Sequence, residues 1–144
     1  MEKRLKLLVV QFIERFYTDF LTWEEVINNL NQSIKNKELI KYNKESFYVS
    51  HSAHIIPKVK ILLNKLNCKE AHLYINFISN KTGFGRHKDS MDVWFWQTIG
   101  QTQWNIEGSS YLLNPGDLIY IPKETYHEVI PNSARVGISM SKWN

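Results

Sequence analysis

The sequence predicts a mainly-β protein, a small barrel of antiparallel strands with a helical cap at its N-terminus. After Cys68, short apolar or alternating stretches are separated by turns rich in Gly, Pro and Asn, with no helical pattern between them. Short strands at this spacing are typical of an antiparallel sandwich or barrel. Before Cys68, apolar residues recur at helical spacing. The 144 residues are expected to form one domain, with 1–70 as the cap and its supporting strands and 71–144 as the barrel core.

The cap is expected to contain two helices. Thr22 and Glu25 match a capping box, and the apolar residues that follow indicate a helix from about Trp23 to Asn36. Pro57 can open a second helix that runs through Leu66, because proline is well tolerated in a first helical turn. The segment 5–20 suits either a helix or an edge strand, and the sequence leaves both open.

The barrel is expected to contain seven strands, which we place at 71–78, 93–99, 103–106, 111–113, 117–121, 127–130 and 135–140. Turns with Gly100, Gly108, Gly116 and Pro131 separate the later ones. An edge strand of such a barrel is also a candidate for pairing in a homodimer.

Charge and cysteine content limit the class of protein. The formal net charge of +4 is compatible with nucleic acid, but a mildly basic globular protein is the commoner explanation. Cys68 is the single cysteine, which excludes a disulfide framework and a thiolate zinc cluster and fits a reducing cytoplasm. No stretch approaches the ~20 apolar residues of a membrane span. We expect a cytoplasmic protein that does not enter the membrane.

His87, Asp89 and His127 form the predicted metal site. In an extended strand residues i and i+2 point to the same face, so His87 and Asp89 can bind one ion. His127 follows the strand that runs from the Pro115-Gly116-Asp117 turn to Pro122. Two imidazoles and one carboxylate make a facial triad with open coordination positions, a set diagnostic mainly of non-haem Fe(II) oxygenases. His-x-Asp alone is a weak pattern, so a second interpretation stays open. In that interpretation His127 is structural and forms a hydrogen bond with a backbone carbonyl.

From about Ala71 to the C-terminus, the chain resembles the cupin superfamily and, within it, the JmjC-type 2-oxoglutarate oxygenases. The run 83–104, which begins Gly-Phe-Gly-Arg-His-Lys-Asp, is similar to the corresponding run of bacterial ribosomal-protein hydroxylases, and 114–128 is similar to their second metal strand. The resemblance implies a double-stranded β-helix, or jelly-roll barrel, with Fe(II) at His87, Asp89 and His127. It also implies a reaction with 2-oxoglutarate and O₂ that gives succinate and CO₂ while a protein side chain or small molecule is hydroxylated.

The resemblance further indicates which residues bind 2-oxoglutarate. At Thr102 the JmjC-type enzymes usually carry Lys or Arg, which pairs with the far carboxylate, and threonine cannot supply that charge. Arg135 is the expected replacement, because it follows His127 by eight residues and prolyl-hydroxylase-like oxygenases carry an arginine at a similar distance after this histidine. Ser139 lies on the same face of the strand as Arg135 and is also expected to bind the cosubstrate. Asn76 and Tyr74 are expected to contact the cosubstrate from the strand before the metal loop. The alternatives are an exposed strand arginine and a solvated strand face.

Two other functions stay open at this stage. One is a metal-binding cupin that acts without 2-oxoglutarate, as an isomerase or a dioxygenase. The other is a non-enzymatic cupin that binds or senses a ligand. At this length we expect the chain to lack the dimerisation and winged-helix regions of larger ribosomal hydroxylases, and this expectation puts a ribosomal substrate in question. His51 and His54 could form a second metal pair, but no carboxylate or cysteine lies close by in sequence, so we expect no metal there.

Overall fold

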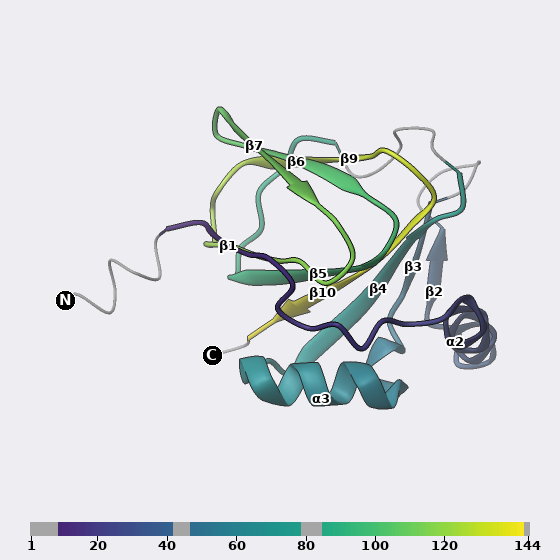
Figure 1. Cartoon of the computed structure of the whole chain (residues 1–144). Helices are drawn as coiled ribbons and strands as arrows, with labels where there is room; N and C mark the ends of the chain where they lie inside the picture. The colour runs from purple at the N-terminus through teal and green to yellow at the C-terminus, as the bar shows by residue number, and fades with distance from the viewer. Residues whose placement is uncertain (1–8, 42–46, 79–84, 143–144) are drawn as a thin grey trace.

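The computed structural model describes residues 9–41, 47–78 and 85–142. The elements in chain order are β1 (Gln11–Ile13), α2 (Trp23–Lys35), β2 (Leu39–Lys41), β3 (Phe47–Ser50), the short 3₁₀-helix η1 (Ala53–Ile55), α3 (Pro57–Leu66), β4 (Glu70–Asn76), β5 (Val93–Ile99), β6 (Thr102–Ile106), β7 (Ser109–Leu113), β8 (Leu118–Ile121), β9 (His127–Pro131) and β10 (Arg135–Ser141). The predicted mainly-β barrel with a helical cap is confirmed (Figure 1). The seven expected strands are present as β4 to β10, with ends shifted by one or two residues.

Two antiparallel sheets face each other across the barrel. The larger has the strand order β1-β8-β5-β10-β4-β3-β2, and the smaller has the order β7-β6-β9. The segment around His87 joins the small sheet beside β9, because His87 and His127 exchange backbone N–H···O bonds of 2.9 and 2.8 Å. The small sheet therefore contains a fourth segment, in the order β7, β6, β9 and the segment around His87. The chain passes repeatedly from one sheet to the other, as in a double-stranded β-helix.

The strand β4 separates the core into two parts. Ala71, Leu73 and Ile75 are buried on the outer face of the large sheet, in one cluster with side chains of the helices α2 and α3. Because side chains alternate along a strand, His72, Tyr74 and Asn76 point the other way, toward the barrel interior. That interior is filled by a second cluster, which comprises Phe95, Trp104, Ile106, Leu113, Ile119 and Ile121.

A glycine on β10 leaves space for an aromatic ring inside the barrel. A Cβ atom on Gly137 would lie 2.1 Å from Cζ of Phe95, which is closer than any two such atoms approach in proteins. Glycine is therefore needed for the Phe95 ring to lie across β10. The ring occupies the gap between Arg135 and Ser139, which flank Gly137 on the same face of the strand.

The structure also tests the predictions for segment 5–20 and for the second helix. Within the described part of 5–20, the chain forms the edge strand β1, which pairs with β8, and not a helix. Residues 5–8 lie outside the described residues, as do Gly83 and Phe84 of the motif before His87. The helix α3 begins at Pro57 and ends at Leu66, as predicted. No helix in the described ranges is long and apolar enough to cross a membrane.

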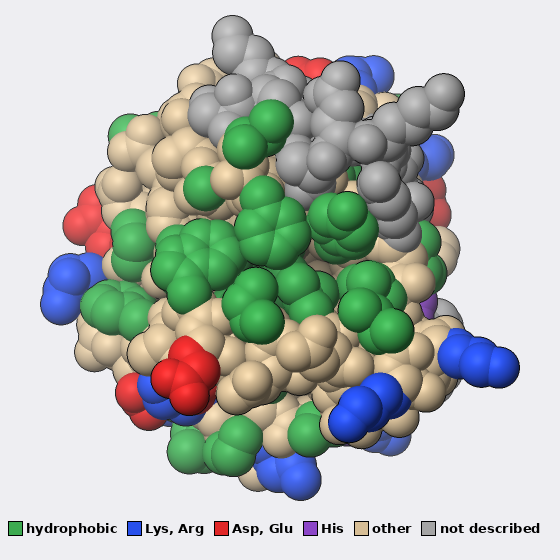
Figure 2. All heavy atoms as spheres, turned by 90° about the vertical axis from the view of Figure 1, so that its right-hand side faces the viewer, with side chains coloured by type: hydrophobic (Ala, Val, Ile, Leu, Met, Phe, Trp, Pro, Cys, Tyr) green, Lys and Arg blue, Asp and Glu red, His purple; other side chains and the backbone are tan. Residues whose placement is uncertain are grey.

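The helix α2 begins at the predicted capping box. Thr22 is the N-cap, its backbone N–H donates to Glu25 Oε1 at 2.9 Å, and the N–H of Glu25 donates to Thr22 Oγ1 at 3.1 Å. The apolar positions of this helix do not all face the core. Ile27 and Ile34 are 42% and 58% exposed. Apolar side chains gather on the side of the molecule where α2 lies (Figure 2).

Candidate active site

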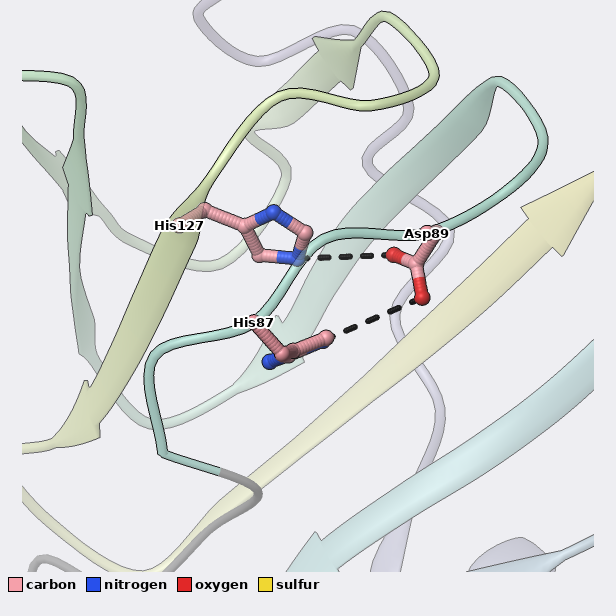
Figure 3. Close-up of side chains that lie close together, drawn as sticks. All are labelled: His87, Asp89 and His127. Atoms are coloured by element: carbon pink, nitrogen blue, oxygen red, sulfur yellow. Dashed lines mark ion pairs between the residues drawn. The ribbon is translucent and has the colours of Figure 1, made fainter.

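His87, Asp89 and His127 converge on one point at the edge of the barrel (Figure 3). His127 Nε2 lies 3.5 Å from Asp89 Oδ2, and His87 Nε2 lies 3.9 Å from Asp89 Oδ1. One ligand atom of each residue lies within 4.8 Å of the other two. Separations of this size suit three ligands around an ion with bonds of about 2.0–2.2 Å. The backbone pairing of His87 with His127 produces this arrangement, because it brings two segments forty residues apart in the sequence side by side.

Both imidazoles are oriented by backbone carbonyls. His87 Nδ1 lies 2.8 Å from the carbonyl oxygen of Gly85, and His127 Nδ1 lies 2.9 Å from that of Thr125. A carbonyl oxygen only accepts hydrogen bonds, so each Nδ1 carries the proton and each Nε2 keeps its lone pair toward Asp89. Metal-binding histidines are commonly fixed in this way. The backbone-carbonyl contact expected of a structural His127 is thus present, but it involves Nδ1. The nitrogen that faces Asp89 is Nε2, so the contact leaves Nε2 available to a metal ion.

The surroundings of His127 favour its neutral form. Its side chain is 4% exposed, and this burial lowers its pKa, with His87 acting in the same direction and the Thr125 carbonyl and Asp89 opposing. A neutral imidazole is the form that binds a metal ion. The indole ring of Trp104 stacks on His127, with ring centroids 5.9 Å apart and planes 16° apart.

Thr102 belongs to the wall of the barrel and not to its cavity. Trp104 Nε1–H donates to Thr102 Oγ1 at 3.0 Å, and the Thr102 hydroxyl donates to Gln97 Oε1 at 2.9 Å. The Gln97 amide in turn donates to the carbonyl oxygens of Ile99 and Gly100 at 2.8 and 3.1 Å. This buried chain of hydrogen bonds holds the indole that stacks on His127.

Arg135 is a buried cation inside the barrel. Its side chain is 1% exposed, and Nε–H donates to Asn76 Oδ1 at 2.6 Å. The guanidinium lies 5.5–6.0 Å from the ring centroids of Phe47, Tyr74 and Phe95. Burial lowers the pKa of Arg135 to about 10, with Tyr74 opposing, so the group stays protonated at neutral pH. The alternative of an exposed strand arginine is wrong.

One atom of this guanidinium has no hydrogen bond. Among the described residues, Arg135 Nη1 is the buried side-chain nitrogen or oxygen that lacks a partner. A buried charge with an unsatisfied N–H is costly, and proteins keep such groups where a ligand completes them or a function requires them. The residue therefore calls for an anion within the cavity.

The metal triad and Arg135 line the same cavity. The polar part of its lining consists of His87, Asp89, His127, Arg135, Tyr74 and Ser139, and the remaining wall of Gly85, Val93, Phe95, Trp104 and Val129. Three of the four residues predicted to bind a cosubstrate thus reach this space. The fourth, Asn76, is fully buried behind Arg135 and holds its Nε. The alternative of a solvated strand face does not hold for Asn76.

Two of the three aromatic rings around Arg135 were not predicted from the sequence. Phe47 lies on β3, a strand that the sequence did not locate, and Phe95 faces inward on β5. Gly137, placed between two polar residues on the inner face of β10, was a sign that a bulky ring lies opposite. His51 stacks on His72 with centroids 4.1 Å apart, and within the described ranges only the triad brings three such ligand atoms together. His51 and His54 form no second cluster of this kind.

Comparison with protein-family models gives no match, and comparison with curated protein sequences gives none. Known structures share the fold. YcfD, a ribosomal oxygenase from Escherichia coli, in complex with cobalt and 2-oxoglutarate, has a TM-score of 0.79 at 14% identity over 99% of this chain and 51% of YcfD. A further structure of Escherichia coli YcfD gives a TM-score of 0.80 at 14% identity over 100% of this chain and 53% of that one.

A cupin superfamily protein from Desulfitobacterium hafniense has a TM-score of 0.54 at 10% identity, covering 73% of this chain and 84% of its own. The chain therefore shares the fold of these structures, in the form found in YcfD. It spans about half the length of YcfD.

Proposed function

We propose that the chain is an Fe(II)- and 2-oxoglutarate-dependent oxygenase that hydroxylates a C–H bond, with succinate and CO₂ as coproducts. The observation that carries the proposal is a single cavity that holds both a His-Asp-His triad and a buried arginine with an unpaired N–H. A metal ion would explain the triad, and an anionic group in the same cavity would explain the arginine. 2-Oxoglutarate meets both demands, because it can chelate a metal at one end and carries a carboxylate at the other.

His87, Asp89 and His127 would hold the iron. Two imidazole nitrogens and one carboxylate, without thiolate, are the ligands that non-haem Fe(II) prefers, and three protein ligands leave positions for cosubstrate and O₂. Bound iron would supply the oxidative chemistry with O₂, coupled to the decarboxylation of 2-oxoglutarate. The Gly85 and Thr125 carbonyls keep each imidazole in the tautomer that binds metal through Nε2.

Arg135 would receive the 5-carboxylate of 2-oxoglutarate. Asn76 holds the guanidinium by Nε, which leaves Nη1 to donate to the carboxylate. Tyr74 and Ser139 line the same cavity, and their hydroxyl groups would donate further hydrogen bonds to the carboxylate. The aromatic rings around the guanidinium exclude water, and a charge-assisted hydrogen bond gains strength in such surroundings.

The alternatives leave one part of the cavity without a role. A cupin that used its metal without 2-oxoglutarate would have no use for the unpaired guanidinium, and a ligand-binding cupin would have no use for the triad. The fold that the chain shares with YcfD, crystallised with cobalt and 2-oxoglutarate, supports the same choice. Because YcfD is a ribosomal oxygenase, we propose a protein side chain ahead of a small molecule as the substrate.

An anaerobic titration tests the proposal. Fe(II) is added to the metal-free protein and then 2-oxoglutarate, while the visible charge-transfer band of the chelate is followed. The band is expected in the wild type and absent in His87→Ala, whereas His54→Ala, at an exposed histidine outside the cavity, keeps it. Iron binding without the band would contradict the use of 2-oxoglutarate and favour a cosubstrate-independent cupin. Absence of iron binding would favour a ligand-binding module.

A further inference from the structure

The helix α2 buries polar side chains and exposes apolar ones. Asn29 and Ser33, which face the sheet, are 4% and 0% exposed. Trp23, Ile27 and Ile34 are 40%, 42% and 58% exposed. At the 100° per residue of an α-helix, these three residues fall on one narrow stripe beside the buried face. A surface helix of a monomer normally has the opposite pattern, with its charged and polar residues outward.

The contacts on the buried face of α2 do not involve this stripe. Asn29 Nδ2 donates to the carbonyl oxygen of Ser52 at 3.0 Å, and Ser50 Oγ donates to Asn29 Oδ1 at 2.8 Å. Ser33 also forms a hydrogen bond with Ser50. The buried side chains of Asn29 and Ser33 therefore have hydrogen-bond partners. Val26 and Leu30 supply the apolar packing of the helix against the core. The parts of Trp23, Ile27 and Ile34 that remain exposed are not covered by this packing within one copy.

The stripe continues onto the end of β4. The rings of Trp23 and Phe77 stack with centroids 6.0 Å apart, and the neighbouring Ile78 is 54% exposed. Figure 2 shows apolar side chains gathered over this face, with an acidic group at the lower left of the patch and basic groups at the lower right. Contiguous exposed apolar patches of this kind, with charges at the rim, are typical of protein interfaces.

The charges beside the stripe fit a second copy of the same chain. Glu24 in the first turn of α2 and Lys35 in the last turn are both exposed and lie on the same flank of the stripe, about 16 Å apart along the axis. When two copies of α2 pack antiparallel about a two-fold axis, each Glu24 meets the partner's Lys35, and the helix dipoles oppose. Trp23 then covers the partner's Ile34. A parallel pair would instead bring two Glu24 side chains together.

We infer that the α2 stripe is the interface of a homodimer in which α2 packs antiparallel against its copy. The inference does not depend on the proposed oxygenase activity. The thirteen residues of α2 span about 20 Å, so with the adjoining β4 end the interface lies at the small end of the stable size range. We expect a dissociation constant on the order of micromolar, so that the dimer is concentration-dependent.

Light scattering or sedimentation over a concentration series through the micromolar range measures the association. The mass should rise from the 17.1 kDa of one chain toward twice that value. Ile27→Asp should abolish the rise, whereas Ile61→Asp, at a 52% exposed isoleucine on α3, should not. Circular dichroism checks that both variants are folded. A wild-type chain that stays monomeric, or a dimer that survives Ile27→Asp, would overturn the inference.

A charge exchange tests the antiparallel arrangement. Glu24→Lys and Lys35→Glu each place like charges together, so each alone should raise the dissociation constant by about tenfold or more. The double variant restores opposite charges across the two-fold axis and should return to near the wild-type value. Because the two residues lie three turns apart within one helix, they cannot compensate inside a single copy. Single variants that dimerise like the wild type, or a double variant that is not restored, would refute antiparallel packing.

Discussion

Replacing Arg135 by methionine is the sharpest test of the proposed cosubstrate anchor. Methionine keeps much of the length and volume of the side chain but removes the charge and the donors. Loss of one member of a buried, hydrogen-bonded charge pair costs about 2–5 kcal/mol. Since about 1.4 kcal/mol corresponds to a factor of ten, the dissociation constant for 2-oxoglutarate should rise between about 30-fold and several thousand-fold.

The same substitution should leave the free energy of unfolding nearly unchanged, which separates a binding role from a structural one. Arg135 is 1% exposed with an unpaired Nη1, so its removal relieves a desolvation cost that the free protein bears. Against this, Asn76 Oδ1 loses the donor that lies 2.6 Å away, at a cost of about 1–3 kcal/mol. The two effects have opposite signs and offset one another.

The assay is anaerobic binding of 2-oxoglutarate to the Fe(II) protein, followed by the chelate band, with iron affinity measured separately. Arg135→Met should bind iron as the wild type does, because the arginine is not a metal ligand. Arg15→Met, at an exposed arginine outside the cavity, is the matched control. Arg135→Lys should give an intermediate loss, since an ammonium keeps the charge but not the planar fork. If Arg135→Met binds 2-oxoglutarate with wild-type affinity, Arg135 Nη1 does not bind the cosubstrate carboxylate.

Three further substitutions probe the walls of the barrel. Thr102→Val keeps the shape but leaves the Trp104 indole N–H without its acceptor, which should lower the free energy of unfolding by about 1–3 kcal/mol in chemical denaturation. Gly137→Ala puts a methyl group against the Phe95 ring and should cost about 1–3 kcal/mol or more in the same assay; wild-type stability would mean that the ring moves freely. Burial, and then His51, lowers the pKa of His72 below 6.5, with Glu70 opposing. The unfolded chain then binds more protons, so stability should fall as pH drops below 6.5, and His72→Gln should flatten that fall.

The parts of the fold that the sequence predicts well are those set by local chemistry. The capping box at Thr22, the Pro57 start of α3 and the alternating strands after Cys68 all appear where expected. In each case the deciding interactions lie within a few residues of one another. The edge strand β1 is different, because its pairing with β8 is a contact across more than a hundred residues that no local pattern encodes.

The face of α2 shows why burial is harder to predict than helicity. The apolar spacing identifies a helix, but it gives no basis for burying Asn29 in preference to Ile27. That choice depends on Ser50 and Ser52, which offer Asn29 its hydrogen bonds from β3 and the turn after it. A polar core contact of this kind needs partners distant in sequence, and the periodicity of the helix itself carries no information about them.

The position of the buried cation follows from how the barrel wall is built. At Thr102 a basic residue would have to replace the hydroxyl that joins Trp104 to Gln97, and the indole that stacks on His127 would lose its support. Arg135 reaches the same cavity from β10 without touching that chain, since Asn76 and three aromatic rings hold it instead. A lysine introduced at 102 would therefore disturb the wall beside the metal before it could compensate for a missing Arg135. The threonine at position 102 and the arginine at position 135 are thus two parts of one arrangement. Among the described residues that line the cavity, Arg135 is the one lysine or arginine.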